Sequence, residues 1–313
     1  MANNIVLKTE NLRKSFGEFT AVHDLTLEVE EGEIFGFLGP NGAGKSTAIN
    51  MMCGLLKPNS GSLYLKGKKV TGGDKTIRTN VGMCPQHLVL WSKLTCNEQL
   101  IHIGEMYGIK SGIARERAQK LLKDMGLEEK KHKQAGTLSG GMQRRMNIIL
   151  ALMHNPEIIV LDEPEAGLDP QSRILVRDYI KTLAKNKTVI LTTHNMDEAE
   201  RVCNHVAIID HGKLLELDTI ENLKKKNRDE NILEIEFEND EIALKSQHIL
   251  TKFGIKINTV GNHLLISDAA IFEKLPEILK TLKDNSFKVS EIKLREHSLE
   301  DIFINLTGRR LRE

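Results

Sequence analysis

The sequence lacks an apolar run of about 20 residues, which is the length that a membrane-spanning helix needs. Its start, "MANNIVLKTE", lacks the basic and apolar regions of a signal peptide. It also lacks an excess of one charge, because 44 lysines and arginines stand against 43 aspartates and glutamates. This balance argues against strong binding to nucleic acid or to an anionic membrane. We therefore expect any role at a membrane to be peripheral.

The sequence has few cysteines, and they form neither a CxxC pair nor the spacing of metal ligands. This usage favours buried thiols in a reducing compartment. At 313 residues the chain exceeds the usual size of one compact domain, which predicts two domains, each with its own core. The four cysteines are Cys53, Cys84, Cys96 and Cys203.

Between about Ile5 and Asp218, short β-branched runs alternate with longer helical patterns. The runs "EIIVL" and "TVILT" are almost wholly apolar, which is typical of parallel strands covered on both faces. Between Thr95 and Ala135 the strand signal gives way to amphipathic helical patterns, and Thr95 and Glu98 have the spacing of a capping box. The sequence predicts an α/β domain over residues 1–222, with a helical subdomain at about residues 93–155.

The charged, glycine-free segment "LKKKNRDEN" predicts a linker at residues 223–231, although a solvated helix face explains this composition equally well. From "NILEIEFE" onward the patterns follow the order β-α-β-β-α-β, with a helix predicted from Ala269 to Asp284. A final helix starts at Ser298 and Asp301. This order is typical of a ferredoxin-like α+β domain, which we predict for residues 232–313.

The stretch "GPNGAGKST" follows the apolar run "EIFGFL" and precedes a helical pattern. It matches G-x-x-x-x-G-K-[ST], and the flanking strand and helix favour a phosphate loop over a structural glycine turn. Backbone N–H groups and the helix N-terminus would surround the phosphates, Lys45 would reach the β- and γ-phosphates, and Ser46 would bind Mg²⁺. The predicted nucleotide-binding residues are Gly39, Pro40, Asn41, Gly42, Ala43, Gly44, Lys45, Ser46 and Thr47.

Two adjacent carboxylates, Asp162 and Glu163, stand at the end of the apolar run "IIVL", where open α/β sheets bind ligands. Asp162 is predicted to hold Mg²⁺, directly or through water, and Glu163 to orient or deprotonate the attacking water. Acidic pairs are also common in ordinary loops. The phosphate loop in the same chain is what favours the catalytic interpretation.

Two further polar residues follow predicted strands. His194 comes directly after "TVILTT" and before a helix capped by Asn195, so that its ring N–H can point toward the γ-phosphate. Gln86 follows "VGMC" and is a candidate to contact the attacking water or the metal. An ordinary turn glutamine explains the local sequence around Gln86 equally well.

The stretch "TLSGGMQRRM" contains more glycine than a helix start requires. Ser139 is a good N-cap for the apolar pattern that includes Met142 and Met146. One cap does not require both Gly140 and Gly141. The glycine pair therefore suggests that something approaches this backbone closely.

In order along the chain, "GPNGAGKST", "PQ", "LSGGMQ", "VLDEP", "AGLDP" and "TTH" resemble the motif series of the nucleotide-binding subunit of ABC transporters, a P-loop NTPase fold. The resemblance covers roughly Val6 to Leu217. It implies that Phe16 stacks on adenine. The local sequence is also compatible with Phe16 as an ordinary core residue. It also implies that Asp169 lies in the loop that couples two nucleotide sites. The residues implied to face the γ-phosphate of a second subunit are Ser139, Gly140 and Gly141.

The same resemblance implies that Gln86 and the following segment, "LVLWSKLT", communicate with a membrane subunit, with Trp91 either a contact or a core residue. The tail "REHSLEDIFINLTGR" resembles that of ATPases from the ABC-2 exporter group, the daunorubicin-resistance type. The alternative is an amphipathic terminal helix that packs on its own domain or on a second copy.

Two positions depart from the usual family pattern. Met142 stands between the second glycine and Gln143, and Glu165 follows the carboxylate motif where serine, threonine or an aromatic residue is more usual. Neither position has a predicted catalytic role. We hypothesise that Glu165 slows turnover or alters the coupling between subunits.

These observations predict an ATPase that uses ATP and Mg²⁺ to power export by a separate integral membrane permease, at the cytoplasmic face of the membrane. The predicted partners are a second ATP-binding subunit, in a homodimer, and the permease; nucleic acid is not expected. The alternatives are a soluble ABC-type mechanochemical ATPase and a nucleotide-dependent regulator without a permease. The single motif set, without sustained heptads, argues against the chromosome-organising and ribosome-associated types.

Overall fold

The structure is a computed structural model that describes residues 4–226, 231–268, 270–295 and 297–307. The chain forms two compact units, Met1–Leu217 and Asp218–Glu313. The predicted domain end at residue 222 and the predicted linker at 223–231 stay predictions, and residues 227–230 of that linker lie outside the described residues. In the second unit, helix α8 (Ile220–Lys225) packs against α11 (Leu299–Thr307).

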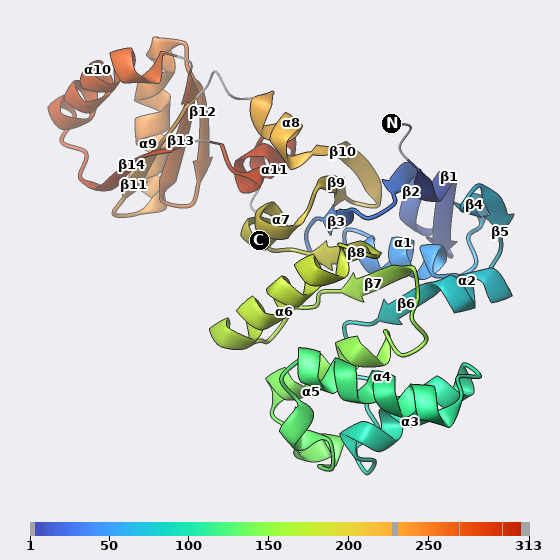
Figure 1. The fold of residues 1–313 in the computed structure, drawn as a ribbon. Coiled ribbons are helices and arrows are strands. Elements are labelled where there is room, and N and C mark those ends of the chain that lie inside the picture. Colours follow the sequence, from blue (N-terminus) through green and yellow to red (C-terminus); the bar gives the residue numbers. More distant parts are fainter. Residues whose placement is uncertain (1–3, 227–230, 269, 296, 308–313) are drawn as a thin grey trace. The chain divides into compact units, whose positions relative to one another are not determined.

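The first unit contains a six-stranded sheet in the order β10-β9-β3-β8-β7-β6 (Figure 1). β3 pairs in parallel with β8 and β9, and β7 pairs in parallel with β6 and β8. β3 and β7 are buried along their whole length, which explains their uninterrupted apolar runs and confirms the predicted α/β domain. The strands are β3 (Ile34–Leu38), β6 (Val81–Cys84), β7 (Ile158–Asp162), β8 (Thr188–Thr193), β9 (His205–Asp210) and β10 (Lys213–Thr219).

A second sheet of this unit has the order β2-β1-β4-β5, in which the neighbouring strands are antiparallel. The sequence patterns do not predict this second sheet. Register shifts between Thr9 and Leu12 and between Leu12 and Lys14 interrupt the period of two that would have indicated the first strand. The strands are β1 (Ile5–Phe16), β2 (Phe19–Glu30), β4 (Ser60–Leu65) and β5 (Lys68–Val70).

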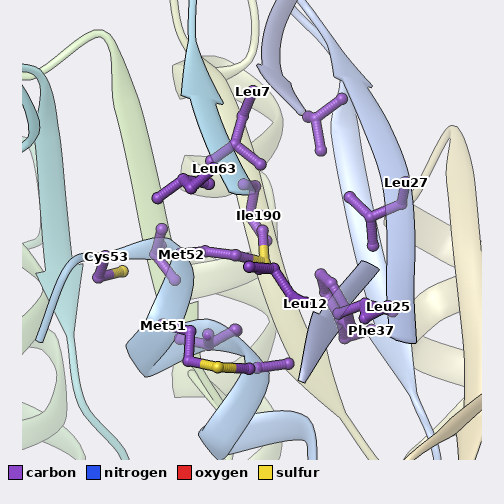
Figure 2. Close-up of a cluster of buried hydrophobic side chains, with 14 of the residues drawn as sticks. Leu7, Leu12, Leu25, Leu27, Phe37, Met51, Met52, Cys53, Leu63 and Ile190 are labelled. Carbon is purple, nitrogen blue, oxygen red and sulfur yellow. The ribbon is translucent and has the colours of Figure 1, made fainter. Parts of the chain in front are cut away.

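The core of the first unit lies around helix α1 (Lys45–Met52), which follows β3 directly. Figure 2 shows Met51 and Met52 of α1 among side chains of both sheets. Leucines come from the antiparallel sheet, and Phe37 and Ile190 come from the parallel sheet. Burial of such a side chain contributes about 1.5–3 kcal/mol relative to leaving it exposed, so this packing fixes the helix that follows the phosphate loop.

The predicted helical subdomain is present as a group of three helices, α3 (Cys96–Met106), α4 (Ser111–Asp124) and α5 (Gly140–Leu150), which pack on one another (Figure 1). Thr95 and Glu98 form the predicted capping box. Short 3-10 turns lie between α4 and α5. The other elements of the unit are α2 (Lys75–Asn80), η1 (Glu128–Lys130), η2 (Ala135–Thr137), α6 (Pro170–Leu183) and α7 (Met196–Val202).

The second unit shows the predicted β-α-β-β-α-β order around an antiparallel sheet arranged β12-β13-β11-β14. Ala269, where the sequence predicts a helix to begin, lies outside the described residues. Ile304 of α11 packs with Ile232 and Leu265 of the sheet, so the terminal helix packs on its own domain. The elements are β11 (Asn231–Phe237), α9 (Asp240–Leu250), η3 (Thr251–Phe253), β12 (Lys256–Val260), β13 (His263–Asp268), α10 (Ile271–Asp284) and β14 (Val289–Arg295).

The four cysteines are buried free thiols, as their usage predicts. Across the described ranges, the helices are all too short or too polar to span a bilayer.

Candidate nucleotide-binding and catalytic site

Three neighbouring parallel strands bring the predicted site residues to one edge of the sheet. β3 ends before the phosphate loop, β8 ends before His194, and β7 ends at Asp162. β8 pairs with both β3 and β7, so the three carboxyl ends lie side by side. This is the edge at which open α/β sheets bind their ligands.

Glycine is required at both ends of the phosphate loop. Gly39 and Gly44 have φ angles of 156° and 97°, in the region that other residues rarely adopt. An added Cβ would stand 2.1 Å from the Ile209 carbonyl at Gly39 and 2.3 Å from the Ala21 carbonyl at Gly44. Gly44 is also the N-cap of α1 and provides no side-chain cap. The first N–H groups of α1 therefore have no capping side chain and can serve a bound anion.

Lys45 lies between the phosphate loop and the carboxylate pair. Its Nζ donates to the carbonyl oxygens of Gly39 at 2.8 Å and Pro40 at 2.9 Å, and it lies 3.9 Å from Glu163 Oε1. Burial lowers the pKa of Lys45 from its usual value, and the charges of Glu163 and Asp162 oppose this shift. The nearby carboxylates favour the charged form of Lys45, which is the form that binds phosphate.

Thr192 of β8 fixes the carboxylate segment. Its Oγ1 donates to Asp162 Oδ1 at 2.5 Å and accepts from the Glu163 backbone N–H at 2.9 Å. Glu163 has a φ angle of 49°, a left-handed conformation that costs a non-glycine residue about 1–3 kcal/mol. Such strain persists only where neighbours hold it, and it is concentrated at functional sites.

The Glu163 carboxylate is also held by His194. His194 Nδ1 lies 2.8 Å from Oε2 and 2.9 Å from Oε1 of Glu163, which is 6% exposed. The structure therefore places Glu163 between Lys45 and His194. The contact with Glu163 uses Nδ1 of His194, so only Nε2 could point toward a γ-phosphate. That expectation stays a prediction.

Gln86 and Phe16 are predicted site residues that lie at exposed positions. The backbone oxygen of Gln86 accepts a hydrogen bond from Arg144, whereas its side chain makes no hydrogen bond to another described residue. Phe16 ends β1 and is 52% exposed, with the Lys14 ammonium 5.3 Å from its ring centroid. This exposure excludes the alternative that Phe16 is a core residue. Ser46, on the first turn of α1, is exposed as well.

The glycine pair at the start of α5 has two different environments. Ser139 is the N-cap and accepts from the Met142 N–H at 3.4 Å. A Cβ on Gly141 would stand 3.0 Å from Ser172 Oγ and 3.3 Å from Asp169 Oδ2, so Gly141 lets the N-terminal end of α6 approach. A Cβ on Gly140 would meet nothing within 4 Å. Gly140 also has no positive φ, so nothing among the described residues requires a glycine there.

Two residues that contact the carboxylate segment, Thr192 and Arg144, are not predicted from the sequence. Thr192 lies within the apolar run of β8. A hydroxyl in such a run is the one sequence feature that could have indicated a buried hydrogen bond. Arg144 is buried on α5 and donates to the backbone carbonyls of Gln86 and Glu163. The sequence feature that could have indicated this role is the position of Arg144, a charged residue four positions before Ile148 and therefore on the apolar face of the helix.

A cavity of about 200 Å³ lies beside Glu163 and includes Glu165, Glu198 and Arg173 in its lining. Arg177 Nη1 lies 3.6 Å from Glu198 Oε2. Burial, together with the neighbouring Glu198 carboxylate, raises the pKa of Glu165 to about 7, while the charges of Arg177 and Arg173 oppose this shift. The unusual acid after the carboxylate motif therefore titrates near neutral pH.

Replacing Glu165 by Gln should stabilise the protein at pH 8 more than at pH 5. The pKa of Glu165 is raised in the folded chain, so between its ordinary value and about 7 the unfolded chain loses a proton that the folded chain keeps. Stability falls as pH rises through this window. Melting temperatures at the two pH values, with the exposed Glu116→Gln as control, provide the test. An equal change at both pH values in Glu165→Gln would contradict it.

A glycine loop between a parallel strand and a helix, with a buried lysine and a strand that ends in two carboxylates, defines a P-loop nucleotide-binding protein. Residues 22–166 match the family model described as ABC transporter. Together with the relatives below, this match shows that the chain belongs to the ABC transporter ATP-binding proteins. It is an ATPase of that family.

Several curated relatives match almost the whole chain. The linearmycin resistance ATP-binding protein LnrL of Bacillus subtilis is 34% identical over 311 residues, covering 98% of this chain and 100% of the relative. A Nod factor export ATP-binding protein I of Cupriavidus metallidurans is 36% identical, with coverage of 98% and 99%. The bacitracin transport ATP-binding protein BcrA of Bacillus licheniformis is 35% identical, with 97% of each chain covered.

Solved structures support the same family. The ADP conformation of MJ1267, an ATP-binding cassette of an ABC transporter, has a TM-score of 0.62 and 30% identity, covering 70% of this chain and 92% of that chain. A solved structure of the ATP-binding subunit of an ABC transporter has a TM-score of 0.65 and 28% identity, covering 71% of this chain and 92% of that chain.

Proposed function

We propose that this chain binds Mg-ATP between two copies of itself and hydrolyses it to power export by a separate membrane permease. The observation that carries the proposal is the position of the Glu163 carboxylate. It is held between Lys45 and His194 at the edge of the sheet where the phosphate loop also lies. Relatives named for linearmycin resistance, Nod factor export and bacitracin transport match nearly the whole chain, which favours an exporter over a soluble ATPase or regulator.

Glu163 is proposed to take the proton of the attacking water, because His194 orients its carboxylate and Lys45 lies beside it. Lys45 would exchange its loop carbonyl partners for the β- and γ-phosphates. His194 would contact the γ-phosphate through its other ring nitrogen. Phe16, an exposed ring at the end of β1, would stack on adenine, and Gln86 would reach the water or the metal once ATP is bound.

The residues predicted to hold Mg²⁺ fit a hard cation that takes oxygen ligands. Asp162 Oδ1 is fixed by Thr192, and the Ser46 hydroxyl is exposed on the first turn of α1. When bound there, Mg²⁺ would neutralise charge on the β- and γ-phosphates. Asp162, Ser46 and Gln86 would hold it, directly or through water.

The second copy is proposed from Gly140. No positive φ and no close contact among the described residues requires a glycine at position 140, whereas a phosphate at the start of α5 would need unobstructed backbone N–H groups. Ser139 and Gly141 would then face the γ-phosphate bound by the other copy. Asp169, 3.3 Å from the position of a Gly141 Cβ, would couple the two sites.

The permease is proposed to bind an apolar cavity of about 300 Å³ between β6, α2 and the helical subdomain. Its lining includes Val89 and Trp91, which are 45% and 42% exposed, so Trp91 is not a core residue. Val89 and Trp91 belong to the segment that begins shortly after Gln86 in the sequence. A short helix of the permease seated there would therefore act on the nucleotide site through the Gln86 segment, and the protein would lie peripherally at the membrane.

Replacing Trp91 by Asp should abolish recovery of the chain with its membrane subunit while leaving basal ATPase activity within about twofold of the parent, because burying an unpaired carboxylate in an apolar contact costs several kcal/mol. Trp91→Phe keeps the apolar surface and should retain the complex. Pull-down from detergent-solubilised membranes measures this. Equal recovery with Asp and Phe would mean that the permease binds elsewhere.

The whole proposal is tested by measuring phosphate release from Mg-ATP and by identifying the protein that co-purifies from membranes. We expect hydrolysis and a multi-helix membrane protein. Ribosomes or DNA as the main co-purifying component would contradict the transporter assignment.

A further inference from the structure

Arg144 of α5 makes five hydrogen bonds, and all five acceptors are backbone carbonyl oxygens. Nη1 donates to two carbonyls of the segment after β6, each at 2.8 Å. Nη2 donates to two carbonyls at the end of β7, each at 2.6 Å, and Nε donates to a third at 3.2 Å. The acceptors are Pro85, Gln86, Asp162, Glu163 and Pro164.

This arrangement uses the whole donor capacity of the guanidinium group, which has five N–H donors in a rigid planar fork. Arg144 is 4% exposed, so each of these bonds replaces a bond to water. A lysine has three donors on one atom and cannot reach two separate loops with a fork. The contact therefore depends on the shape of arginine as well as on its charge.

The acceptors belong to the two segments that the proposed mechanism uses. Glu163 leaves the regular strand conformation, so its carbonyl and those beside it turn toward α5. Asn147, one turn further along α5, holds the other segment: its Nδ2 donates to the Pro85 carbonyl at 3.3 Å, and its Oδ1 accepts from the Val89 N–H at 3.1 Å. The same helix begins at Ser139.

We propose that Arg144 is a positioning residue for ATP hydrolysis, joining the helix that starts at Ser139 to the Gln86 segment and to the Glu163 segment. A displacement of α5 is then transmitted to both segments at once. The side chains of Glu163 and Gln86 therefore reach their catalytic positions only when α5 is in the position seen in this structure. The inference rests on the proposed roles of Glu163 and Gln86. Arg144 itself touches neither nucleotide nor water in this account.

The test is Arg144→Lys in the full-length protein, with kcat counted per bound nucleotide. Because the phosphate loop lies between β3 and α1, and none of the five hydrogen bonds of Arg144 reaches it, the Kd for Mg-ATP should stay within about threefold of the parent. The value of kcat should fall about 10²-fold, which is the effect of a misplacement near 1 Å. Hydrogen exchange should become faster in residues 84–89 and 162–168 together. A purely stabilising role would lower the folded fraction without changing kcat per bound nucleotide.

Arg145→Lys is the matched control, because Arg145 is the next residue of α5 and donates to the single carbonyl of Met125 at 2.8 Å. It should keep the parent kcat and the parent exchange rates. Arg144→Met, which removes the charge and every donor but keeps an unbranched apolar stem, should lose kcat at least as strongly as Arg144→Lys. Unchanged kcat in Arg144→Lys would overturn the proposal, as would failure of both Arg144 variants to bind nucleotide, since Arg144 would then maintain the fold.

Failure of this inference is distinguishable from failure of the proposed function. If the parent does not hydrolyse ATP, the function is wrong. If the parent hydrolyses ATP and Glu163→Gln does not, but Arg144→Lys matches the parent, only the role of Arg144 is wrong.

Discussion

Glu163→Gln is expected to hydrolyse ATP about 10³-fold more slowly than the parent, the effect of removing a general base. Glutamine has the size of glutamate and can keep the contact with His194 Nδ1, so the site geometry should be preserved. It cannot accept the proton of the attacking water. Phosphate release at saturating Mg-ATP measures the rate, and equilibrium binding of ATP should be retained.

The same variant should accumulate as a dimer in Mg-ATP, because hydrolysis no longer opens the proposed interface. Light scattering should give twice the mass of the single chain with Mg-ATP, and the mass of the single chain after ATP is removed. Glu157→Gln is the matched control: it makes the same chemical change at an exposed residue just before β7. It should keep the parent rate. Hydrolysis by Glu163→Gln at that rate would refute the role of Glu163 as the base.

Ser139→Asp is expected to abolish ATP-dependent dimerisation and hydrolysis while leaving ATP bound to the chain's own phosphate loop. Aspartate is as good an N-cap as serine, so α5 keeps its start. Its charge would face the γ-phosphate of the other copy. Two like charges about 4 Å apart repel by ~4 kcal/mol near a protein surface, which weakens the dimer at least about 10³-fold, because this repulsion acts at each of its two sites. The dimer dissociation constant, measured by sedimentation, reports this change.

Ser139→Asn is the matched control, since asparagine caps equally well and carries no charge. It should dimerise in Mg-ATP with an affinity within about tenfold of the parent. If the aspartate variant dimerises as tightly as the asparagine variant, Ser139 does not face a phosphate. Gly140 would then require another explanation.

The elements that carry a local sequence pattern could be predicted from the sequence. The strand, glycines, lysine and helix of the phosphate loop are contiguous in the sequence. In the structure β3 leads into the glycine loop, and α1 begins at Lys45, as predicted. The buried strand that the sequence predicts before Asp162 and Glu163 is β7. The capping box at Thr95 and the β-α-β-β-α-β order of the second unit are likewise local signals.

Contacts between segments distant in the sequence could not be predicted. Thr192 contacts Asp162 across 30 positions, and Arg144 reaches Pro85 across 59. Which polar residues meet depends on strand order and helix packing, and neither has a local signature. The antiparallel sheet was missed for a different reason, because its bulges disturb the period that strand prediction uses. Whether the terminal helix packs on its own domain was settled by the burial of Ile304.

The central claim, that each ATP site is completed by a second copy, is tested most directly by mixing Glu163→Gln with Ser139→Asp. Each variant alone should be inactive. A mixed dimer contains one site built from the intact Glu163 of one chain and the intact Ser139 of the other. The account predicts that an equimolar mixture regains hydrolysis, with activity that rises as total protein concentration rises. A mixture no more active than its separate components would contradict it.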